Sequence, residues 1–435
     1  MRAESIRKQC LLICYYFPPA PMAYAQRVAK LCKYLPQETA WIPHVICGEL
    51  PWDLLAGRDD TLLKEIPEEV SITRVGSFLS SPLARRLRAW RLYKPVGLLR
   101  KLIVAPDNFG DWVKPVVAES EARFREGKGI EAIFASGPPN SVYVAAMCLS
   151  KRWKCPLIID MRDPWESSWG KRKWFESLCY RKTRKIEQEV YQQASVIITN
   201  TAGNLAQLIN QFPDFADKIL MVPNGFDPED IIQDQGPKLR RKDEHEGTVH
   251  LLYLGGFRGK GFEDHFFNAV AAYLQEHPKD RYRLKVHCVG WTANQLESTA
   301  KKFSLSEVCH AYGVVPAGEV GRPLSEADIY VLLAPINSPG WIPAKLYYYL
   351  AGGKYIFAMI PDGSARDIIA TIGNRAEICA PNDMGKARDA LARIIQKVRK
   401  SEESQRSTEF PAYALPYDRR VIAREIGAIL DRVDR

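Results

Sequence analysis

The chain has 435 residues, which is long enough for two domains with room for a third. Hydrophobic residues make up 46% of it and charged residues 26%, the balance of a globular, soluble protein. No apolar run approaches the roughly 20 residues of a spanning helix, which excludes an integral membrane protein of the helical type.

The net charge of +10 is unevenly spread along the chain. Residues 1–225 carry 32 basic and 23 acidic side chains, whereas residues 226–435 carry 29 and 28. Residues 82–101 hold no acidic side chain, and Leu83, Leu87 and Trp90 recur there at helical spacing. The basic side chains of this segment are Arg85, Arg86, Arg88, Arg91, Lys94, Arg100 and Lys101. Such a segment favours an anionic membrane surface, and a solvated helix face explains it equally well. Without a recognition motif, we expect no nucleic-acid partner.

The cysteines and histidines give no sign of a metal site. None of the ten cysteines forms a Cys-x-x-Cys pair, and the seven histidines lack metal-ligand spacing. We expect buried free thiols in a reducing compartment. The apolar run at residues 10–14 is too short for a secretory signal and continues as a strand. These features predict a cytoplasmic protein.

The first half of the chain alternates apolar strands with helices, as a doubly wound parallel sheet does. The predicted strands cover Cys10–Tyr16, Ile42–Cys47, Ile130–Ala135, Pro156–Asp160, Ser195–Thr199 and Ile219–Val222. The predicted helices cover Ala23–Leu35, Ser141–Trp153, Trp174–Gln193 and 201–211. A turn at Val222–Pro228 marks the end of a first domain, residues 1–225. Polar residues 229–248 are typical of a linker or mobile loop.

The alternation then restarts. The predicted strands are Val249–Leu254, Arg283–Val289, Val308–Tyr312, Ile329–Leu333 and Tyr355–Ile360, of which the last completes the sheet. Predicted helices cover Phe262–Gln275, 293–303, a short segment from Pro343 to Gly352-Gly353, and Arg419–Val433. We expect a second domain over residues 226–412 and a C-terminal helix, 413–435, that packs back on the first domain. Ligands of such sheets bind at the carboxyl ends of strands, so loops of both domains should form the site in a cleft.

The segment Ile342–Pro361 carries the strongest functional signal. Lys345 lies in the first turns of its helix, where the helix dipole usually disfavours a cation. A bound anion would explain this, because helix N-termini attract phosphate. The plainer alternative is that a helix, two glycines and a strand occur in any α/β protein.

The same segment resembles nucleotide-sugar glycosyltransferases of the two-domain GT-B architecture, especially glycosyltransferase family 4. The matching residues are Pro343, Lys345, Leu346, Tyr347, Tyr349, Leu350, Ala351, Gly353, Lys354 and Ile356. Tyr348 stands where the family has a glutamate, and Tyr355 where it has a proline. Gly340 stands at the place of a second glutamate. A carboxylate can accept two hydrogen bonds from a ribose diol, whereas a phenol has one oxygen, so these departures affect the donor side.

The loop Tyr253–Gly261 directly follows a strand. Its glycines let the backbone approach a phosphate, and its two basic residues can neutralise a diphosphate, although a plain turn explains the loop alone better. By the resemblance, Arg258 or Lys260, with Lys345, stabilises the charge of the leaving nucleoside diphosphate. The resemblance also places the backbone of residues 312–316 at the base. The donor-binding residues it implies are Gly255, Gly256, Lys260, Asn224, Tyr312, Val314, Tyr348 and Ser364.

Two strand ends in the first domain carry polar residues, at 135–141 and 160–165. Asp160, Arg162 and Asp163 form an acid–base–acid run where a ligand is expected. Alternatively, Asp163 caps a turn and Asp160 pairs with Arg162. These motifs, with residues 15–19, 33–36 and 106–112, resemble one branch of family 4. The resemblance implies catalytic roles for Asp160, Arg162 and Asp163. It also implies an acceptor side formed by Arg27, Ser136 and Ser141.

Two further departures concern this domain. Residues 20–26 lack the glycines of the branch, so side chains occupy the space there. No histidine follows the turn at 136–139, and Tyr143 stands near its place. We therefore name no general base. In a retaining transfer by front-face attack, the departing phosphate can take the acceptor proton.

Taken together, the sequence predicts an α/β protein of GT-B fold, with two doubly wound parallel-sheet (Rossmann-like) domains facing a cleft. It predicts a glycosyltransferase that moves a sugar from a nucleotide-sugar donor to a glycan or lipid-linked acceptor. The transfer is expected to retain configuration and to serve cell-surface polysaccharide or glycolipid assembly at the inner face of the plasma membrane. We expect no metal and no cofactor beyond the nucleotide-sugar co-substrate. The alternatives are a catalytically inert relative that binds or scaffolds a partner, and a sugar-nucleotide epimerase.

Overall fold

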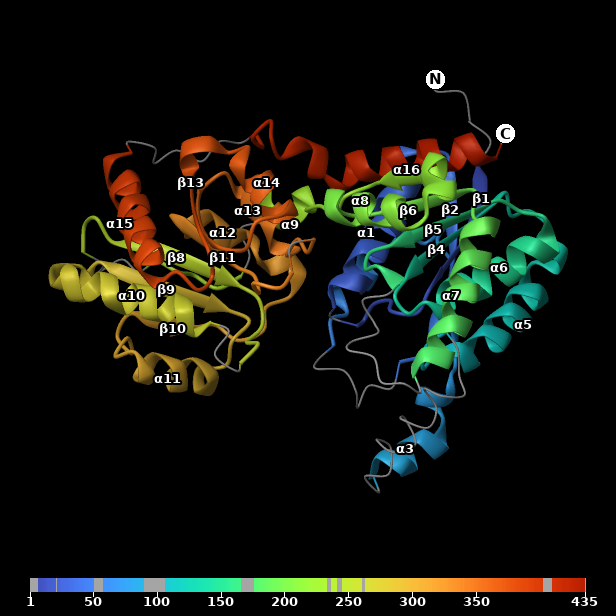
Figure 1. Ribbon diagram of the computed structural model, residues 1–435, viewed down its shortest axis with the longest axis horizontal. Coiled ribbons are helices and arrows are strands. Elements are labelled where there is room, and N and C mark those ends of the chain that lie inside the picture. The colour runs from blue at the N-terminus through green and yellow to red at the C-terminus, as the bar shows by residue number, and fades with distance from the viewer. Residues whose placement is uncertain are drawn as a thin grey trace. The chain divides into compact units, whose positions relative to one another are not determined.

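A computed structural model describes residues 7–20, 22–50, 58–89, 106–165, 176–232, 236–240, 245–259, 263–338, 340–401 and 409–434 (Figure 1). The chain divides into two compact units. Unit 1 comprises Met1–Pro223 and Arg419–Arg435, and unit 2 comprises Asn224–Asp418. The sequence prediction had placed the first domain boundary at residue 225 and the return of the chain at residue 413.

Unit 1 is built on a seven-stranded sheet in the order β3-β2-β1-β4-β5-β6-β7, with every neighbouring pair parallel. The strands are β1 (Lys8–Cys14), β2 (Trp41–Gly48), β3 (Ile72–Val75), β4 (Ala132–Gly137), β5 (Leu157–Met161), β6 (Val196–Thr199) and β7 (Ile219–Met221). Alternate side chains of β1 enter two separate cores, Leu11 and Ile13 on one face and Leu12 on the other. Helices therefore have to cover both faces of this sheet.

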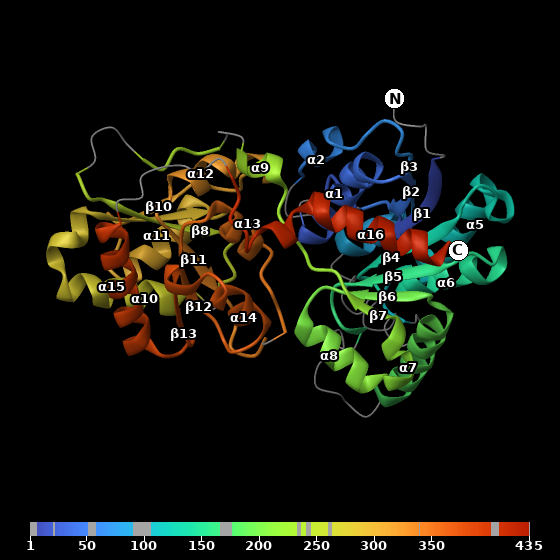
Figure 2. The same ribbon diagram turned by 90° about the horizontal axis from the view of Figure 1, so that it is seen from above.

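The helices of unit 1 lie between these strands in the chain, except the C-terminal helix α16. They are α1 (Ala23–Glu38), α2 (Thr61–Lys64), α3 (Pro82–Ala89), α5 (Val113–Arg123), α6 (Ser141–Trp153), α7 (Glu176–Gln193), α8 (Ala202–Gln211) and α16 (Arg419–Val433). The C-terminal helix α16 packs along α1 (Figure 2). A Cβ atom at Gly427 would lie 2.4 Å from Cγ2 of Thr39, so glycine permits this close approach.

Unit 2 is built on a six-stranded parallel sheet in the order β10-β9-β8-β11-β12-β13. The strands are β8 (Val249–Leu254), β9 (Leu284–Val289), β10 (Cys309–Ala311), β11 (Ile329–Leu333), β12 (Tyr355–Met359) and β13 (Ala376–Cys379). The helices are α9 (Pro228–Ile232), α10 (Asp264–Glu276), α11 (Ala293–Lys302), α12 (Gly321–Glu326), α13 (Lys345–Gly352), α14 (Ser364–Ala370) and α15 (Met384–Lys400).

The structure corrects three expectations. The strand at Tyr355 does not complete the second sheet, because β13 pairs beyond it. Residues 229–248 are not a plain linker, since they contribute most of α9 and the buried Leu239. The backbone N–H of Leu239 donates to Glu326, which fixes this stretch to unit 2. The helix of the Ile342–Pro361 segment begins at Lys345, two residues after Pro343.

Candidate functional site

The carboxyl ends of three neighbouring strands of unit 2 are tied together through glycines. The N–H of Gly255, after β8, donates to Val289 O at 2.9 Å, and the N–H of Gly290, after β9, donates to Gly313 O at 2.6 Å. Gly290 has φ +106°, and a Cβ there would lie 2.7 Å from the carbonyl carbon of Gly255. Only glycine fits such a position, so the strand ends form one closely joined edge. Ligands of doubly wound sheets bind at this edge.

Two cations meet at this edge. The Lys345 Nζ lies 3.5 Å from the centroid of the Tyr253 ring and 3.5 Å from where a Cβ of Gly255 would be. The Arg258 guanidinium carbon lies 4.6 Å from the ring centroid of Trp341. The structure thus brings Arg258, Lys345 and the glycine loop together. Their roles in catalysis stay predictions. Lys260 lies outside the described residues, and Gly256 has open space beside it.

Lys345 has an unusual protonation equilibrium. Burial, and then the positive charge of Arg258, lower the pKa of its amine to about 7, while the charge of Glu263 opposes this shift. At neutral pH, the side chain therefore lies near the midpoint of its titration. A bound polyanion would favour the protonated form.

Glu263, which the sequence prediction missed, lies under the same loop. Its carboxylate accepts the backbone N–H of Arg258 at 2.8 Å, and its side chain is buried. Burial raises its pKa, and the hydrogen bonds from the loop backbone oppose that shift. The available signal was an acidic residue just before α10, at the end of the glycine run.

Tyr312 and Val314 lie at the edge but differ in direction. The Tyr312 hydroxyl shares a 2.8 Å hydrogen bond with His287 Nδ1, and His287 Nε2 shares one of 2.9 Å with His250 Nδ1. Burial lowers the pKa of His250 to about 3 and that of His287 to about 2, so both are neutral at pH 7. The phenol of Tyr312 therefore points into the unit. Val314 is 77% exposed, which leaves the predicted base-contacting backbone at the surface.

Tyr348 occupies the position where the family has a glutamate, and its hydroxyl donates to the Asp230 carboxylate at 2.8 Å. A carboxylate from α9 thus lies next to the position that lacks one on α13. Ser364 is the buried first residue of α14, and Asn224 is the half-buried first residue of unit 2. The donor-binding roles of Ser364 and Asn224 stay predictions, because burial and location alone do not test them.

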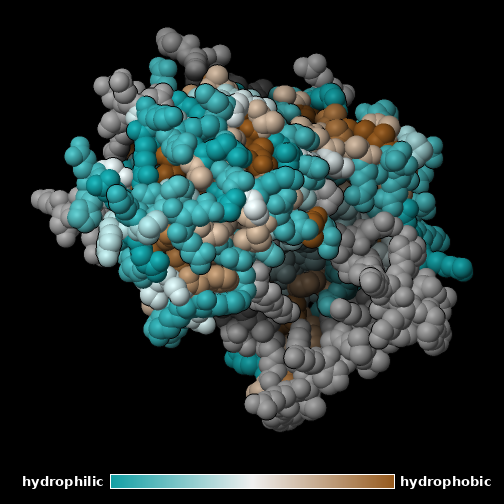
Figure 3. Space-filling model, turned by 60° about the vertical axis from the view of Figure 1, so that its left-hand side comes forward, coloured by the Kyte–Doolittle hydropathy of each residue, from teal (hydrophilic) through white to brown (hydrophobic). Residues whose placement is uncertain are grey.

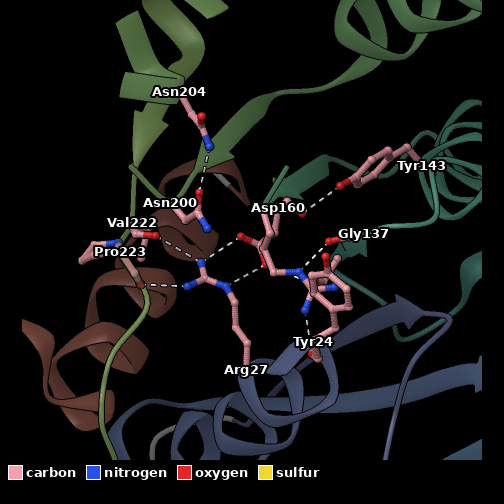
Figure 4. A network of polar contacts seen from close by, with 11 residues as sticks. Tyr24, Arg27, Gly137, Tyr143, Asp160, Asn200, Asn204, Val222 and Pro223 are labelled. Atoms are coloured by element: carbon pink, nitrogen blue, oxygen red, sulfur yellow. Dashed lines mark hydrogen bonds and ion pairs between the residues drawn. The ribbon is translucent and has the colours of Figure 1, made fainter. Parts of the chain in front are cut away.

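In unit 1, Asp160 is held by Arg27 rather than by Arg162 (Figure 4). Arg27 donates from Nη2 to Asp160 Oδ1 at 2.8 Å and from Nε to Oδ2 at 3.0 Å. It also donates to Pro223 O at 2.7 Å, and the Ser136 hydroxyl donates to Asp160 Oδ2 at 2.7 Å. Asp160 is 1% exposed and Arg27 4%. Such burial favours a structural role for this network over contact with a ligand.

Electrostatics agree with an ionised Asp160. Burial alone would raise the pKa of its carboxyl group. The charges of Arg27 and Arg162, with the hydrogen bonds from Arg27 and Ser136, outweigh burial and lower that pKa below its usual value. The pair joins α1 to β5, and Arg27 also ties α1 to the chain just after β7, at Val222 and Pro223.

Arg162 and Asp163 both contact Tyr24, the second residue of α1, which belongs to the stretch 20–26 that lacks glycine. Arg162 donates to Gly137 O at 2.5 Å and to Tyr24 O at 2.7 Å, and it is buried. Its guanidinium carbon lies 4.5 Å from the Tyr24 ring centroid. The Tyr24 hydroxyl donates to Asp163 Oδ2 at 2.8 Å. Of the three predicted catalytic residues of unit 1, Asp163 is the one that is half-exposed.

Ser141 begins α6 and is fully buried. Its hydroxyl donates to Asp107 Oδ1 at 2.5 Å, and its backbone N–H donates to Oδ2 at 3.0 Å. Asp107 therefore satisfies the N-terminus of this helix. Ser136 is also buried, and its hydroxyl donates to Asp160. Both predicted acceptor-side serines thus have internal partners.

Comparison with known proteins identifies the class of fold. No family model matches the chain. In a search of solved structures, a sucrose-phosphate synthase from Thermosynechococcus elongatus aligns over 98% of this chain and 99% of its own, with a TM-score of 0.62 and 12% identity. WaaG, a glycosyltransferase involved in lipopolysaccharide biosynthesis, aligns over 97% and 99%, with a TM-score of 0.59 and 14% identity. With its two parallel sheets, the chain has the GT-B fold, and the predicted fold class is confirmed.

Two other similarities are more specific in what they name. HepE of Anabaena, solved in complex with UDP-glucose, aligns over 98% of this chain and 99% of its own, with a TM-score of 0.58 and 12% identity. A D-inositol 3-phosphate glycosyltransferase of Geodermatophilus obscurus is 31% identical over 164 residues, which are 36% of each chain. The chain thus spans about a third of the length of the curated relative that it matches.

Proposed function

We propose that the protein is a nucleotide-sugar-dependent glycosyltransferase whose unit 2 holds the diphosphate of the donor. The observation that carries this proposal is the placement of Arg258 and Lys345 beside the glycine loop at the carboxyl end of β8. The similarity to a curated glycosyltransferase supports it, as does the shared fold of a protein solved with UDP-glucose.

The chemistry asked of these residues is electrostatic. Negative charge develops on the nucleoside diphosphate as the glycosidic bond to it breaks, and two fixed cations stabilise that charge in the transition state. In a retaining transfer, the departing phosphate takes the proton of the acceptor hydroxyl, so no protein base is required. We propose that the acceptor is a glycan or a lipid-linked molecule. The reaction then takes place in the cytoplasm and contributes to the assembly of a cell-surface polysaccharide or glycolipid.

A turnover assay tests this function. The protein is incubated with each member of a panel of sugar nucleotides, with and without glycan and lipid acceptors, and free nucleoside diphosphate is measured. Acceptor-dependent release is the expected result. Conversion of a donor into its sugar epimer without acceptor would favour the epimerase alternative. Absence of both reactions with every donor would favour a catalytically inert relative.

The binding of a nucleoside diphosphate should depend on pH. The pKa of Lys345 is about 7 in the free protein, and a bound diphosphate raises it, so binding takes up a proton. Affinity should therefore fall as pH rises above 7, by up to about tenfold per pH unit until the pKa of the bound state is reached. Calorimetry with uridine diphosphate between pH 7 and 9 measures this slope, above the last phosphate pKa of about 6. Lys345→Arg, which stays charged, should remove the slope. Equal slopes in both proteins would contradict the assignment.

We also propose that α3 binds an anionic membrane surface. Leu83 is 57% exposed, Arg85 and Arg86 are exposed, and Ala84 packs inward. The helix lies at the edge of unit 1, away from its sheet (Figure 1). The remaining residues of the predicted segment, 90–101, lie outside the described residues.

Within the described part of the chain, every helix is too short or too polar to cross a bilayer. In Figure 3, the coloured hydrophobic residues form only small groups on a largely hydrophilic face.

Liposome flotation tests this surface. The protein should float with vesicles that contain anionic lipid and stay behind with neutral ones. Replacing Arg85 and Arg86 by glutamine should weaken binding about 30-fold, at about 1 kcal/mol for each basic residue. Lys301→Gln with Lys302→Gln, on α11, removes the same charge elsewhere and serves as the control. If flotation does not depend on lipid charge, the basic side chains of α3 only form a solvated helix face.

A further inference from the structure

The side chains that hold the two cations of the proposed diphosphate site are aromatic. Lys345 lies over Tyr253, the fifth residue of β8, and Arg258 lies over Trp341, in the segment between β11 and α13. The strands β8 and β11 are neighbours in the sheet, so their carboxyl ends emerge side by side. The first contact joins the end of β8 to the start of α13, and the second joins the loop after β8 to the segment after β11.

An aromatic partner has a particular consequence for an anion site. The face of an indole attracts a guanidinium through the ring quadrupole and leaves its formal charge in place. A carboxylate partner would instead neutralise that charge. The Glu263 carboxylate accepts the backbone N–H of Arg258. The backbone and the side chain of Arg258 thus have separate supports, and the contact with Trp341 does not neutralise the guanidinium.

Phe257, the residue before Arg258, is also held by an indole. The Phe257 ring packs against the buried Trp291 at a centroid distance of 4.6 Å, with 65° between the ring planes. Residues 257 and 258 are therefore held by two different indoles, and Glu263 holds the backbone between them. Of these supports, the contact with Trp341 acts on the charged group itself.

From this geometry, we propose that Trp341 is a positioning residue, which holds the Arg258 guanidinium in place for the diphosphate of the donor. This inference rests on the proposed function and deepens it, because it assigns a role to a residue that touches the cation and not the substrate. Fixing a flexible arginine before binding removes part of the ordering cost that binding would otherwise carry.

A double-mutant cycle in the 435-residue chain tests the role, with uridine, guanosine and adenosine diphosphates as the titrants. The nucleoside diphosphate that wild type binds most tightly is then used throughout. Arg258→Ala should weaken its binding about tenfold, and Trp341→Leu about three- to tenfold. Trp341→Phe keeps an aromatic face and should recover most of the loss. In the Arg258→Ala background, Trp341→Leu should have no further effect, because Trp341 acts through Arg258.

Other results would overturn the inference. If the losses from Arg258→Ala and Trp341→Leu are additive, Trp341 supports the fold and not the guanidinium. The same holds if Trp341→Phe binds as weakly as Trp341→Leu, or if Trp341→Leu binds like wild type. These results leave the proposed function standing when wild type binds. Absence of binding by wild type to all three nucleoside diphosphates would overturn the inference and the donor site together.

Discussion

Replacement of Lys345 by alanine should weaken the binding of uridine diphosphate about 100-fold at pH 6.5, the largest effect on ligand binding that we expect. At this pH, most of the amine is protonated, because its pKa is about 7 in the free protein. A charge-assisted hydrogen bond in a partly desolvated site is worth about 1.5–3 kcal/mol, and a bridging ammonium makes more than one. Calorimetric titration of both proteins measures the difference.

A matched control separates this local effect from the loss of one positive charge. Lys301→Ala removes an exposed lysine of unit 2 on α11 and should leave the affinity within about twofold of wild type. The donor-site assignment fails if Lys345→Ala and Arg258→Ala both titrate like wild type. A loss as large in Lys301→Ala as in Lys345→Ala would mean that overall charge, and not the loop, attracts the nucleotide.

Arg27→Ala should destabilise unit 1 by about 3–5 kcal/mol, because it leaves the Asp160 carboxylate buried without its partner. Breaking such a pair costs far more than breaking an exposed one. For a unit of this size, the loss corresponds to a fall of about 10 °C in the midpoint of its thermal transition. Circular dichroism during heating, at pH 7, measures it. Arg58→Ala, which breaks the exposed pair with Asp60, should change the midpoint by 2 °C at most.

Two further measurements sharpen this prediction. Arg27→Met combined with Asp160→Leu removes both charges and should restore most of the stability, since an apolar pair can replace a buried ion pair. The lowered pKa of Asp160 also sets a pH dependence. Its stabilising contribution is full above the unfolded pKa of about 4 and is lost as pH falls through the lower folded value. If the Arg27→Ala protein is as stable as wild type, the network around Asp160 does not stabilise unit 1.

The sequence predicted the central parts of both sheets well. The helix Ser141–Trp153 and the strands Val249–Leu254 and Ile329–Leu333 lie at the predicted residues. Their apolar runs are long and end at glycine, proline or polar residues, which gives clear boundaries. The edge strands β3 and β13 were missed, because each is four residues long and only partly buried. A short, half-polar edge strand has no distinctive sequence pattern.

In the candidate site, too, features that depend on a local motif could be predicted, and contacts between residues far apart in the sequence could not. The placement of Arg258 and Lys345 at one sheet edge could be predicted because each stands in a recognisable local motif, whereas their roles stay predictions. The aromatic neighbour of Arg258, Trp341, could not be predicted, since this contact depends on how two strand ends meet. In unit 1, Asp160 had Arg162 as its nearest candidate in sequence, yet its partner is Arg27, 133 residues away. Pairing of buried charges depends on the sheet order, which spacing along the chain does not reveal.

The measurement that tests the central claim most directly is a calorimetric titration of the 435-residue protein with a panel of nucleotide sugars. We predict that at least one of them binds at one site per chain and that its nucleoside diphosphate competes for that site. The same titration with Lys345→Ala should then show the loss described above. If no nucleotide sugar and no nucleoside diphosphate binds the wild-type protein, the proposed function is wrong, and the chain keeps the GT-B fold without its donor.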